Sequence, residues 1–256
     1  DNFMFNDEEK NDFENKEPLS KQFFYRWFGA DEFINNKLRW CLYLGKASPS
    51  ELNKMPYTKA IVQKVKEYRS MSDRAQTKKY ADYPTRFYLE VIPASNYIVV
   101  PVVSSEKRRY IPIGYLTPAV LCSNQLNMIP NASLFHFGVL TSNVHNAWMR
   151  TVCGRLKSDY RYSKDIVYNN FPWPTPTDEQ KARVEQTAQA ILDARALYPD
   201  SSLADLYDEL TMPAELRKAH QDNDRAVMAA YGFNTKMTES ECVAELMKMY
   251  QELTKE

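Results

Sequence analysis

The run AWMRTVCGRLKSDYRYSKDIVYNNFPW, residues 147–173, is the stretch around which the rest of this chain is organised. It mixes cations with tyrosines and ends at a proline-rich junction. These residues are Arg150, Arg155, Lys157, Tyr160, Arg161, Tyr162, Lys164 and Tyr168. Cations neutralise phosphates and aromatic rings pack on bases, so this composition is typical of a surface that meets nucleic acid.

A long helix is expected immediately before the basic part of this run, from Ser133 as its N-cap to Gly154 after its last turn. Its apolar residues recur at spacings of three and four, at Leu134, Phe137, Leu140, Val144, Trp148 and Val152. His136 and His145 fall among them without Cys, Asp or Glu at ligand spacing. We therefore interpret both histidines as packed or surface residues and expect no metal site.

After Gly154, charged residues alternate with tyrosines. If the segment is extended, Lys157, Asp159 and Arg161 share one face. Lys can donate to O6 and N7 of guanine and Asp can accept from N4 of the paired cytosine, so Lys157 and Asp159 could read both halves of a G·C pair. Arg161 is a further candidate for base contact. The alternative is a surface ion pair of Asp159 with Arg155 or Arg161.

Strand patterns occupy much of the remaining sequence. We expect strands at residues 23–28, 38–44, 87–91, 97–103, 110–115, 119–123 and 126–129. The segment SSEKRR joins two of them as a hairpin with a basic tip. The tip either contacts phosphates or keeps a sheet edge soluble. The full set of expected phosphate contacts is Lys107, Arg108, Arg109, Arg150, Arg155 and Lys164.

An amphipathic helix is expected after residues 48–50. Its apolar positions are Ile61, Val62, Val65 and Tyr68. Its polar positions are Lys59, Lys64, Lys66 and Arg69. This basic face is either solvated or in contact with phosphates.

The formal net charge of zero conceals three blocks of different sign. Residues 1–20 carry two Lys and seven Asp or Glu, residues 21–175 carry 22 Lys or Arg and 10 Asp or Glu, and residues 176–256 have a net charge of −7. A block with a net charge of +12 between two acidic ends is expected when one domain meets a polyanion and its neighbours do not. The alternative is an ordinary solvated surface.

Length and composition indicate a globular cytoplasmic protein. The 256 residues, 44% of them hydrophobic, can bury a core and form one or two domains. No apolar run of about 18 residues is present, and the acidic start differs from a signal peptide and resembles the edge of a fragment. The four cysteines are far apart and lack a C-x-x-C pair, which favours free thiols. They are Cys41, Cys122, Cys153 and Cys242.

The sequence after residue 175 has the start and stop signals of helices. Pro172, Pro174 and Pro176 mark a boundary, and capping boxes begin at Thr177 and Thr238. A further helix is expected from Pro213 to a stop at Gly232.

Catalytic motifs are not evident. Six scattered glycines supply no Gly-rich turn for S-adenosylmethionine, and neither an Asn-Pro-Pro-aromatic loop nor a nuclease motif is present. The run NNFPW at residues 169–173 lacks the Pro-Pro pair, so we interpret it as a structural junction. We expect no catalytic residues and no cofactor in this fragment.

Several phrases resemble one known family. GADEFIN (29–35), RWCLYL (39–44), residues 140–163 and IVYNNFPWP (166–174) resemble the target-recognition region of the MmeI-like (type IIG/IIL) single-chain restriction-modification enzymes. SLADLYDELTMPAELRKAH (202–220) and AAYGF (229–233) are similar to the helical segment that follows it. The resemblance covers almost the whole chain. It implies a parent enzyme with a nuclease and an adenine-N6 methyltransferase ahead of this region, using Mg²⁺ and S-adenosylmethionine there. It also implies that Lys157 and Asp159 act as a pair that reads an outer base, with G as the base.

Together these observations predict an α+β fold. We expect an acidic linker at residues 1–20, a mixed α/β target-recognition domain at 21–175 and a small all-helical domain at 176–256. The expected function is sequence-specific recognition of double-stranded DNA in the major groove, in cis with the parent's other domains and without membrane or metal. The alternatives are a protein-interaction module without DNA affinity and a nucleic-acid-modifying enzyme with unrecognised motifs.

Overall fold

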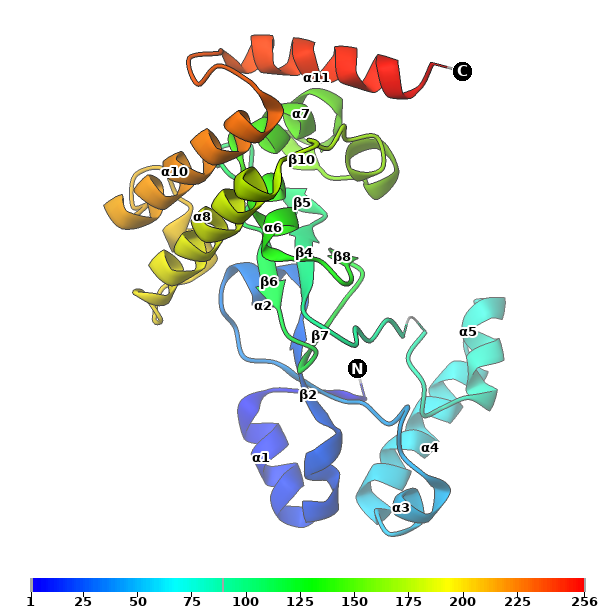
Figure 1. The fold of residues 1–256 in the computed structure, drawn as a ribbon. Helices are drawn as coiled ribbons and strands as arrows, with labels where there is room; N and C mark the ends of the chain where they lie inside the picture. The colour runs from blue at the N-terminus through cyan, green and yellow to red at the C-terminus, as the bar shows by residue number, and fades with distance from the viewer. Residues whose placement is uncertain (1, 89, 256) are drawn as a thin grey trace. The chain divides into compact units, whose positions relative to one another are not determined.

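The computed structural model, which describes residues 2–88 and 90–255, has an α+β fold that divides into two units (Figure 1). Within those residues, the first unit comprises the chain up to residue 32, then 37–92 and 118–124. The second unit comprises 33–36, 93–117 and the chain from 125 onward. None of the helices in the described ranges is long and apolar enough to cross a membrane.

A four-stranded sheet organises the first unit. Its strands lie in the order β1 (Met4–Phe5), β3 (Trp40–Leu42), β2 (Phe24–Phe28) and β7 (Val120–Cys122). β3 is antiparallel to both β1 and β2, whereas β7 is parallel to β2. The predicted strands at 23–28, 38–44 and 119–123 are therefore confirmed, with shorter bounds.

Residues 2–20, the described part of the expected linker, are folded into this unit. β1 pairs with β3, and α1 (Asp7–Lys16) brings Phe13 against Phe5 and Phe24, with ring centroids 5.1 to 5.9 Å apart. After α1 comes the 3₁₀ helix η1 (Pro18–Phe23). The buried Glu17 carboxylate accepts hydrogen bonds from the backbone N–H groups of Tyr57 and Thr58 at 2.8 and 2.9 Å. An acidic residue of the expected linker thus accepts hydrogen bonds from the free N–H groups in the first turn of a helix 40 residues away.

That helix is α4 (Pro56–Ser70), which confirms the predicted amphipathic helix. It follows α3 (Pro49–Asn53) and precedes α5 (Ala75–Lys79) and the 3₁₀ helix η2 (Tyr80–Asp82). The Arg69 guanidinium, half-buried between them, donates to the carbonyl oxygens of Tyr80, Tyr83 and Arg86 at 3.1, 2.9 and 2.7 Å. Of the strand expected at 87–91, residue 89 lies outside the described residues, and the described neighbours form no strand.

The second unit contains a three-stranded antiparallel sheet with β4 (Tyr97–Pro101) between β6 (Gly114–Leu116) and β8 (Leu126–Ile129). All five residues of β4 are buried. The predicted strand at 126–129 is confirmed. The strand expected at 110–115 is much shorter, because Tyr110 and Ile111 are held by side chains of helices and not by a neighbouring strand. Short α2 (Ala30–Ile34) places Phe33 against Gly114.

The expected single helix from Ser133 to Gly154 is wrong. The structure has two helices, α6 (Leu134–Thr141) and α7 (Asn143–Val152). Ser142 between them is extended, with φ −74° and ψ 163°, and its side chain accepts a hydrogen bond from the His145 N–H. Ser142 is therefore an N-cap that begins a new helix.

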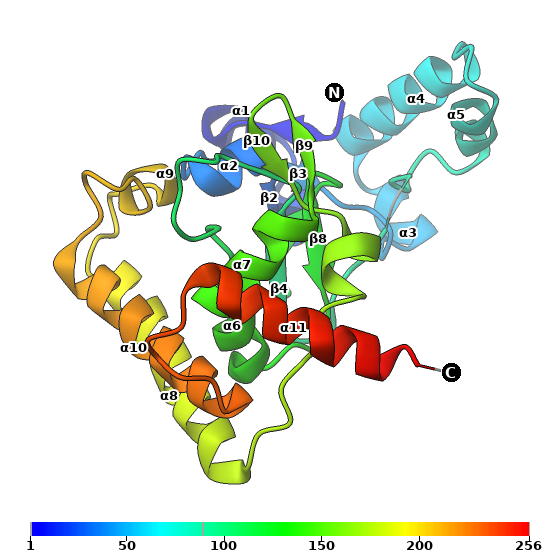
Figure 2. The same cartoon turned by 90° about the horizontal axis from the view of Figure 1, so that it is seen from above.

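The C-terminal helices are α8 (Asp178–Ala196), α9 (Leu203–Leu206), α10 (Ala214–Tyr231) and α11 (Glu239–Leu253). The capping boxes at Thr177 and Thr238 are confirmed, and Gly232 ends α10 with φ 70°. Pro213 is the residue before α10 and not its first helical residue. Figures 1 and 2 show α8 and α10 side by side, with α11 next to α7. One hydrophobic core joins these helices to β4, α6 and α7 of the same unit.

Candidate nucleic-acid interface

The residues after α7 form a β-hairpin. Its strands are β9 (Gly154–Leu156) and β10 (Asp159–Arg161), and β10 also pairs with β5 (Val103–Ser104) to complete a three-stranded sheet. Asp159 pairs with Leu156, so Lys157 and Ser158 alone make the turn. The condition under which Lys157, Asp159 and Arg161 would share one face, a single extended segment, is therefore not met, because Lys157 occupies the tip of the hairpin.

Lys157 has a φ of 55°, in the left-handed region that residues with a Cβ rarely adopt. Two-residue hairpin turns require positive φ because their twist then matches that of the strands, and Gly or Asn normally supplies it. The sequence has Lys in this position, so its turn signal is weak. Strained residues at exposed sites are typical of functional positions, which directs attention to the Lys157 side chain.

The two faces of the hairpin differ. Arg155 and Tyr160 are cross-strand partners, and the Arg155 guanidinium lies 4.1 Å from the centroid of the Tyr160 ring. Arg155 also donates to the Ser158 carbonyl oxygen at 2.7 Å and pairs with Glu106 at 3.5 Å. On β10, Asp159 and Arg161 alternate with Tyr160 and therefore lie on the opposite face. Arg155 thus stabilises the turn, and a contact of Arg155 with phosphate stays a prediction.

Asp159 is tied to the neighbouring loop. Its Oδ1 accepts a hydrogen bond from the Glu106 N–H at 3.3 Å. Among the residues that the structure describes, Oδ2 has no hydrogen bond, and Asp159 forms no ion pair with Arg155 or Arg161. The surface ion pair, considered as the alternative to base reading, is therefore not what holds this carboxylate.

Residues 105–109 form the basic turn that was predicted to be a hairpin tip. β4 and β6 do pair, but β5 leaves this arrangement to pair with β10, so the turn lies beside the β9–β10 hairpin. Lys107 and Arg109 are exposed. Arg108 is half-buried, and burial lowers its pKa while Asp159 and Asp208 act in the opposite direction. Arg108 is thus less accessible to a phosphate than its two neighbours.

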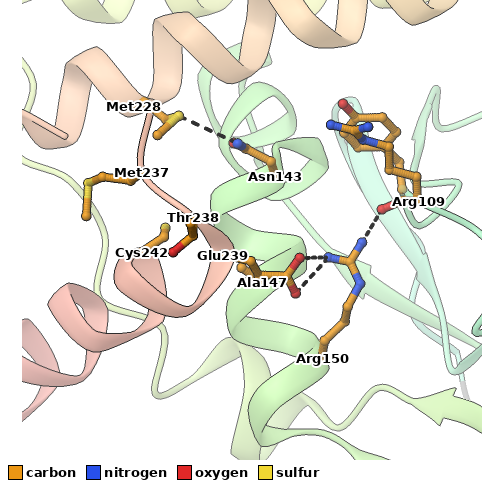
Figure 3. Close-up of a pocket in the computed structure, with 10 residues that line it drawn as sticks. Arg109, Asn143, Ala147, Arg150, Met228, Met237, Thr238, Glu239 and Cys242 are labelled. Carbon is orange, nitrogen blue, oxygen red and sulfur yellow. Dashed lines mark hydrogen bonds and ion pairs between the residues drawn. The ribbon is translucent and has the colours of Figure 1, made fainter. Parts of the chain in front are cut away.

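Arg150 is also engaged within the protein (Figure 3). Its guanidinium donates to both carboxylate oxygens of Glu239 at 3.3 Å and to the carbonyl oxygen of Arg109. These groups line a cavity of about 420 Å³ that Asn143 and Cys242 also border. Arg150 therefore fixes the backbone of the basic turn relative to α11. A phosphate contact by Arg150 stays a prediction.

A buried polar network, which was not predicted from the sequence, anchors the other end of this turn. The Tyr110 hydroxyl donates to Asp224 Oδ2 at 2.6 Å, and the Asn143 N–H donates to Asp224 Oδ1 at 2.8 Å. The ring of Tyr110 stacks on His220 with centroids 4.2 Å apart, and Asn146 Oδ1 accepts from the Ile111 N–H at 3.0 Å. Burial raises the pKa of Asp224 to about 6, although both hydrogen bonds lower it. The chain is therefore fixed immediately after Arg109.

His145, His136 and the junction at 169–173 have structural partners. His145 is fully buried, its Nε2 lies 3.0 Å from the Tyr162 hydroxyl, and burial lowers its pKa to about 3. His136 Nδ1 accepts from the Ser133 N–H at 3.1 Å. Asn170 Nδ2 donates to carbonyl oxygens of the π-helical turn η3 (Lys164–Tyr168), at 2.9 and 3.1 Å. Lys164 is exposed at the start of that turn.

The cysteines and possible metal ligands suggest no further chemistry. All four cysteines are free, and burial raises the pKa of Cys41 to about 12 and that of Cys242 to about 11. Within residues 2–88 and 90–255, no group of three His, Cys, Asp or Glu side chains is arranged to hold a metal ion.

Six cations of this region are exposed, and one of them, Arg155, pairs with Glu106; the other five are Lys107, Arg109, Lys157, Arg161 and Lys164. None of them forms an ion pair in the described part of the chain. We call these five residues the basic strip. Of the remaining predicted site residues, Arg150 and Arg155 are bound to groups of the protein, and Arg108 is half-buried.

Two family models together match the full chain. Residues 1–175 match the model described as MmeI, target recognition domain, and residues 176–256 match the one described as MmeI, C-terminal domain. DNA methyltransferase A of Bacillus subtilis (strain 168) is 37% identical over 252 residues, which cover 98% of this chain and 28% of that protein. The structure of the type IIL restriction-modification enzyme MmeI in complex with DNA is 48% identical with a TM-score of 0.93, covering 99% of this chain and 34% of that one. This chain thus spans about a third of the length of these relatives.

Proposed function

Because this chain belongs to the MmeI family, as its target recognition and C-terminal domains, we propose that it binds double-stranded DNA in a sequence-specific way. The observation that carries the proposal is the basic strip. Four of its cations, Lys107, Arg109, Lys157 and Arg161, are exposed on one hairpin and its neighbouring turn, the fifth, Lys164, begins the η3 turn after β10, and none forms an ion pair in the described residues. Phosphates supply the missing negative charge. The similarity to the structure of MmeI in complex with DNA adds support.

Base reading is proposed for Lys157 and Asp159, with Arg161 beside them. Lys157 presents an ammonium donor at the tip of the hairpin, and a hairpin tip can enter a groove of DNA. Asp159 has one carboxylate oxygen engaged by Glu106 and a second that can accept from a cytosine N4 amino group. A donor and an acceptor two residues apart fit a G·C pair in the major groove, with guanine facing Lys157. Lys107, Arg109 and Lys164 would then contact phosphates, which fix the register.

The longer protein to which such a chain belongs is proposed to be a site-specific adenine-N6 methyltransferase and restriction endonuclease of the cytoplasm. This chain would supply recognition alone, while S-adenosylmethionine and Mg²⁺ would bind to other parts of that protein. The lack of a Gly-rich cofactor turn and of an Asn-Pro-Pro-aromatic loop supports this division. The side chain of Asn170, engaged with η3, is unavailable to hold a flipped base.

The test is a fluorescence-anisotropy titration of the chain with duplex DNA at two salt concentrations, followed by selection from a randomised site library. We expect binding that weakens steeply with salt and a defined preference in the library. Exchange of Lys157 and Asp159, as K157D with D159K, should change the preferred base pair at one position and leave the others. A chain without affinity at low salt would favour a protein-interaction module, and an unchanged preference would remove the assignment of this pair.

A further inference from the structure

The first unit has a second surface with unneutralised charge, remote in sequence from the basic strip. We define the α4–α5 arm as residues 54–88. It contains nine Lys or Arg and three Asp or Glu, a net charge of +6. The cations are Lys54, Lys59, Lys64, Lys66, Arg69, Arg74, Lys78, Lys79 and Arg86. All except the half-buried Arg69 are exposed.

These cations lack acidic partners. Among the described residues, none of the nine takes part in an ion pair. Glu67, the one acidic residue on α4, accepts a hydrogen bond from Gln63 at 2.8 Å. Two lysines of the C-terminal helices, by contrast, have carboxylate partners, since Lys218 pairs with Asp222 and Lys248 with Glu245. A surface of like charge repels itself unless it meets an anion.

Exposed tyrosines accompany the charges. Tyr57, Tyr68 and Tyr83 are 52, 70 and 59% exposed. Large aromatic side chains left in solvent to this extent are typical of a contact surface, and a tyrosine hydroxyl can donate to a phosphate oxygen. The arm also borders a cavity of about 420 Å³, which is lined by three of its tyrosines, by Lys79 and Arg86, and by Glu90 just beyond the arm.

The arm holds its charges in a defined arrangement. α4 and α5 lie side by side (Figures 1 and 2), and the three carbonyl contacts of Arg69 fasten the segment after α5 to α4. Lys59 and Lys66 are seven residues apart on one side of α4, a rise of about 10 Å. That distance covers several phosphates of one DNA strand, which follow each other every 3.4 Å along the axis.

We propose that the α4–α5 arm binds the phosphates of duplex DNA and contributes affinity without reading bases. The proposal rests on the proposed function, that the chain binds duplex DNA. Six of the nine cations are lysines, which contact phosphate as flexible point charges and lack the planar fork with which arginine recognises guanine. A uniform polyanion can satisfy cations spread over two helices and a loop, whereas a protein partner would need a carboxylate matched to each.

The test compares three versions of the full chain: wild type, an arm variant and a control variant with the same net charge. The arm variant carries K59Q, K64Q, K66Q, K78Q and K79Q, and the control carries K181Q, K218Q, K236Q, K248Q and K255Q. Each is titrated with labelled duplex at several salt concentrations between 50 and 200 mM. Glutamine keeps helix propensity, and thermal melting confirms that all three versions are folded.

We expect the arm variant to bind more weakly, with a shallower dependence of affinity on salt. If the arm variant loses three phosphate contacts, the ratio of the wild-type affinity to the variant's affinity should fall about 40-fold between 50 and 200 mM salt. The control should retain the wild-type slope, and library selection should return the same preferred sequence for the arm variant as for wild type. Equal slopes for all folded versions would overturn the inference and favour a protein partner for the arm. If wild type itself fails to bind at low salt, the proposed function fails instead.

Discussion

Replacement of Asp224 by Asn should change how the stability of this protein depends on pH. In the folded protein, burial raises the pKa of Asp224 to about 6, whereas an unfolded chain has an Asp pKa of about 3.9. The folded state therefore binds the proton more tightly, and the contribution of Asp224 to stability falls as pH rises through this interval. A difference of about two pKa units corresponds to about 3 kcal/mol.

Asn at position 224 keeps both contacts. Its oxygen can accept from the Asn143 N–H, and its amide can donate to the Tyr110 hydroxyl, in place of the two bonds that Asp224 accepts at 2.8 and 2.6 Å. The carboxylate and its burial cost are removed. The free energy of unfolding of D224N minus that of wild type should consequently increase by about 3 kcal/mol between pH 3.5 and 7 and stay constant above it.

Urea denaturation of both proteins at half-unit pH intervals measures this difference. His145 and His220 are buried with lowered pKa values, so their contribution to stability falls as pH decreases below about 6.5. This dependence on pH is opposite to that of Asp224. Both proteins retain these histidines, and their effect cancels in the subtraction. A difference that is independent of pH, or that decreases with pH, would refute the assignment of a raised pKa to Asp224.

Two other substitutions test features that the fold depends on. Glu17→Ala should destabilise the protein by about 1 to 3 kcal/mol in urea denaturation, because the N–H groups of Tyr57 and Thr58 lose their acceptor; an unchanged midpoint would contradict this role. Lys157→Gly should relieve the left-handed strain and raise stability by up to about 1 kcal/mol, while it weakens the preference for one base pair in the site library. Equal selectivity of K157G and wild type would show that the tip side chain does not read DNA.

Local signals in the sequence predicted much of the helical structure. Capping boxes at Thr177 and Thr238 place a side-chain acceptor and its partner three residues apart, so both partners are visible in one short run. The role of Gly232 can likewise be predicted from this residue alone, because the left-handed backbone conformation at the end of a helix favours glycine. These features need no information about the tertiary structure.

The break at Ser142 was missed because helical periodicity continues across it. Leu140 and Val144 keep a spacing of four, and both are buried, although they belong to different helices. The turn at Lys157 was missed for the reverse reason. Alternating charges and tyrosines fit a strand, and the residue that adopts positive φ is not one that normally signals a turn.

Long-range partners explain the remaining differences at the candidate site. Arg150 looks like a free cation in the sequence, but Glu239 lies 89 residues away and meets it in the fold. Tyr110 and Asp224 are separated by 114 residues. The basic strip consists of the predicted cations that have no such partner, and this selection requires the three-dimensional structure.

The network around Asp224 also limits how recognition modules can be exchanged between relatives. A graft cut at residue 175, where the two family models meet, would separate Tyr110 and Asn143 from Asp224 and leave buried polar groups without partners. It would also remove Asn223, which donates to the Gly138 carbonyl oxygen at 2.8 Å, and Arg195, which donates to that of Ile113 at 2.7 Å. A transplant that alters specificity should therefore carry residues 176–256 along with the hairpin, or be restricted to the few side chains at its exposed tip.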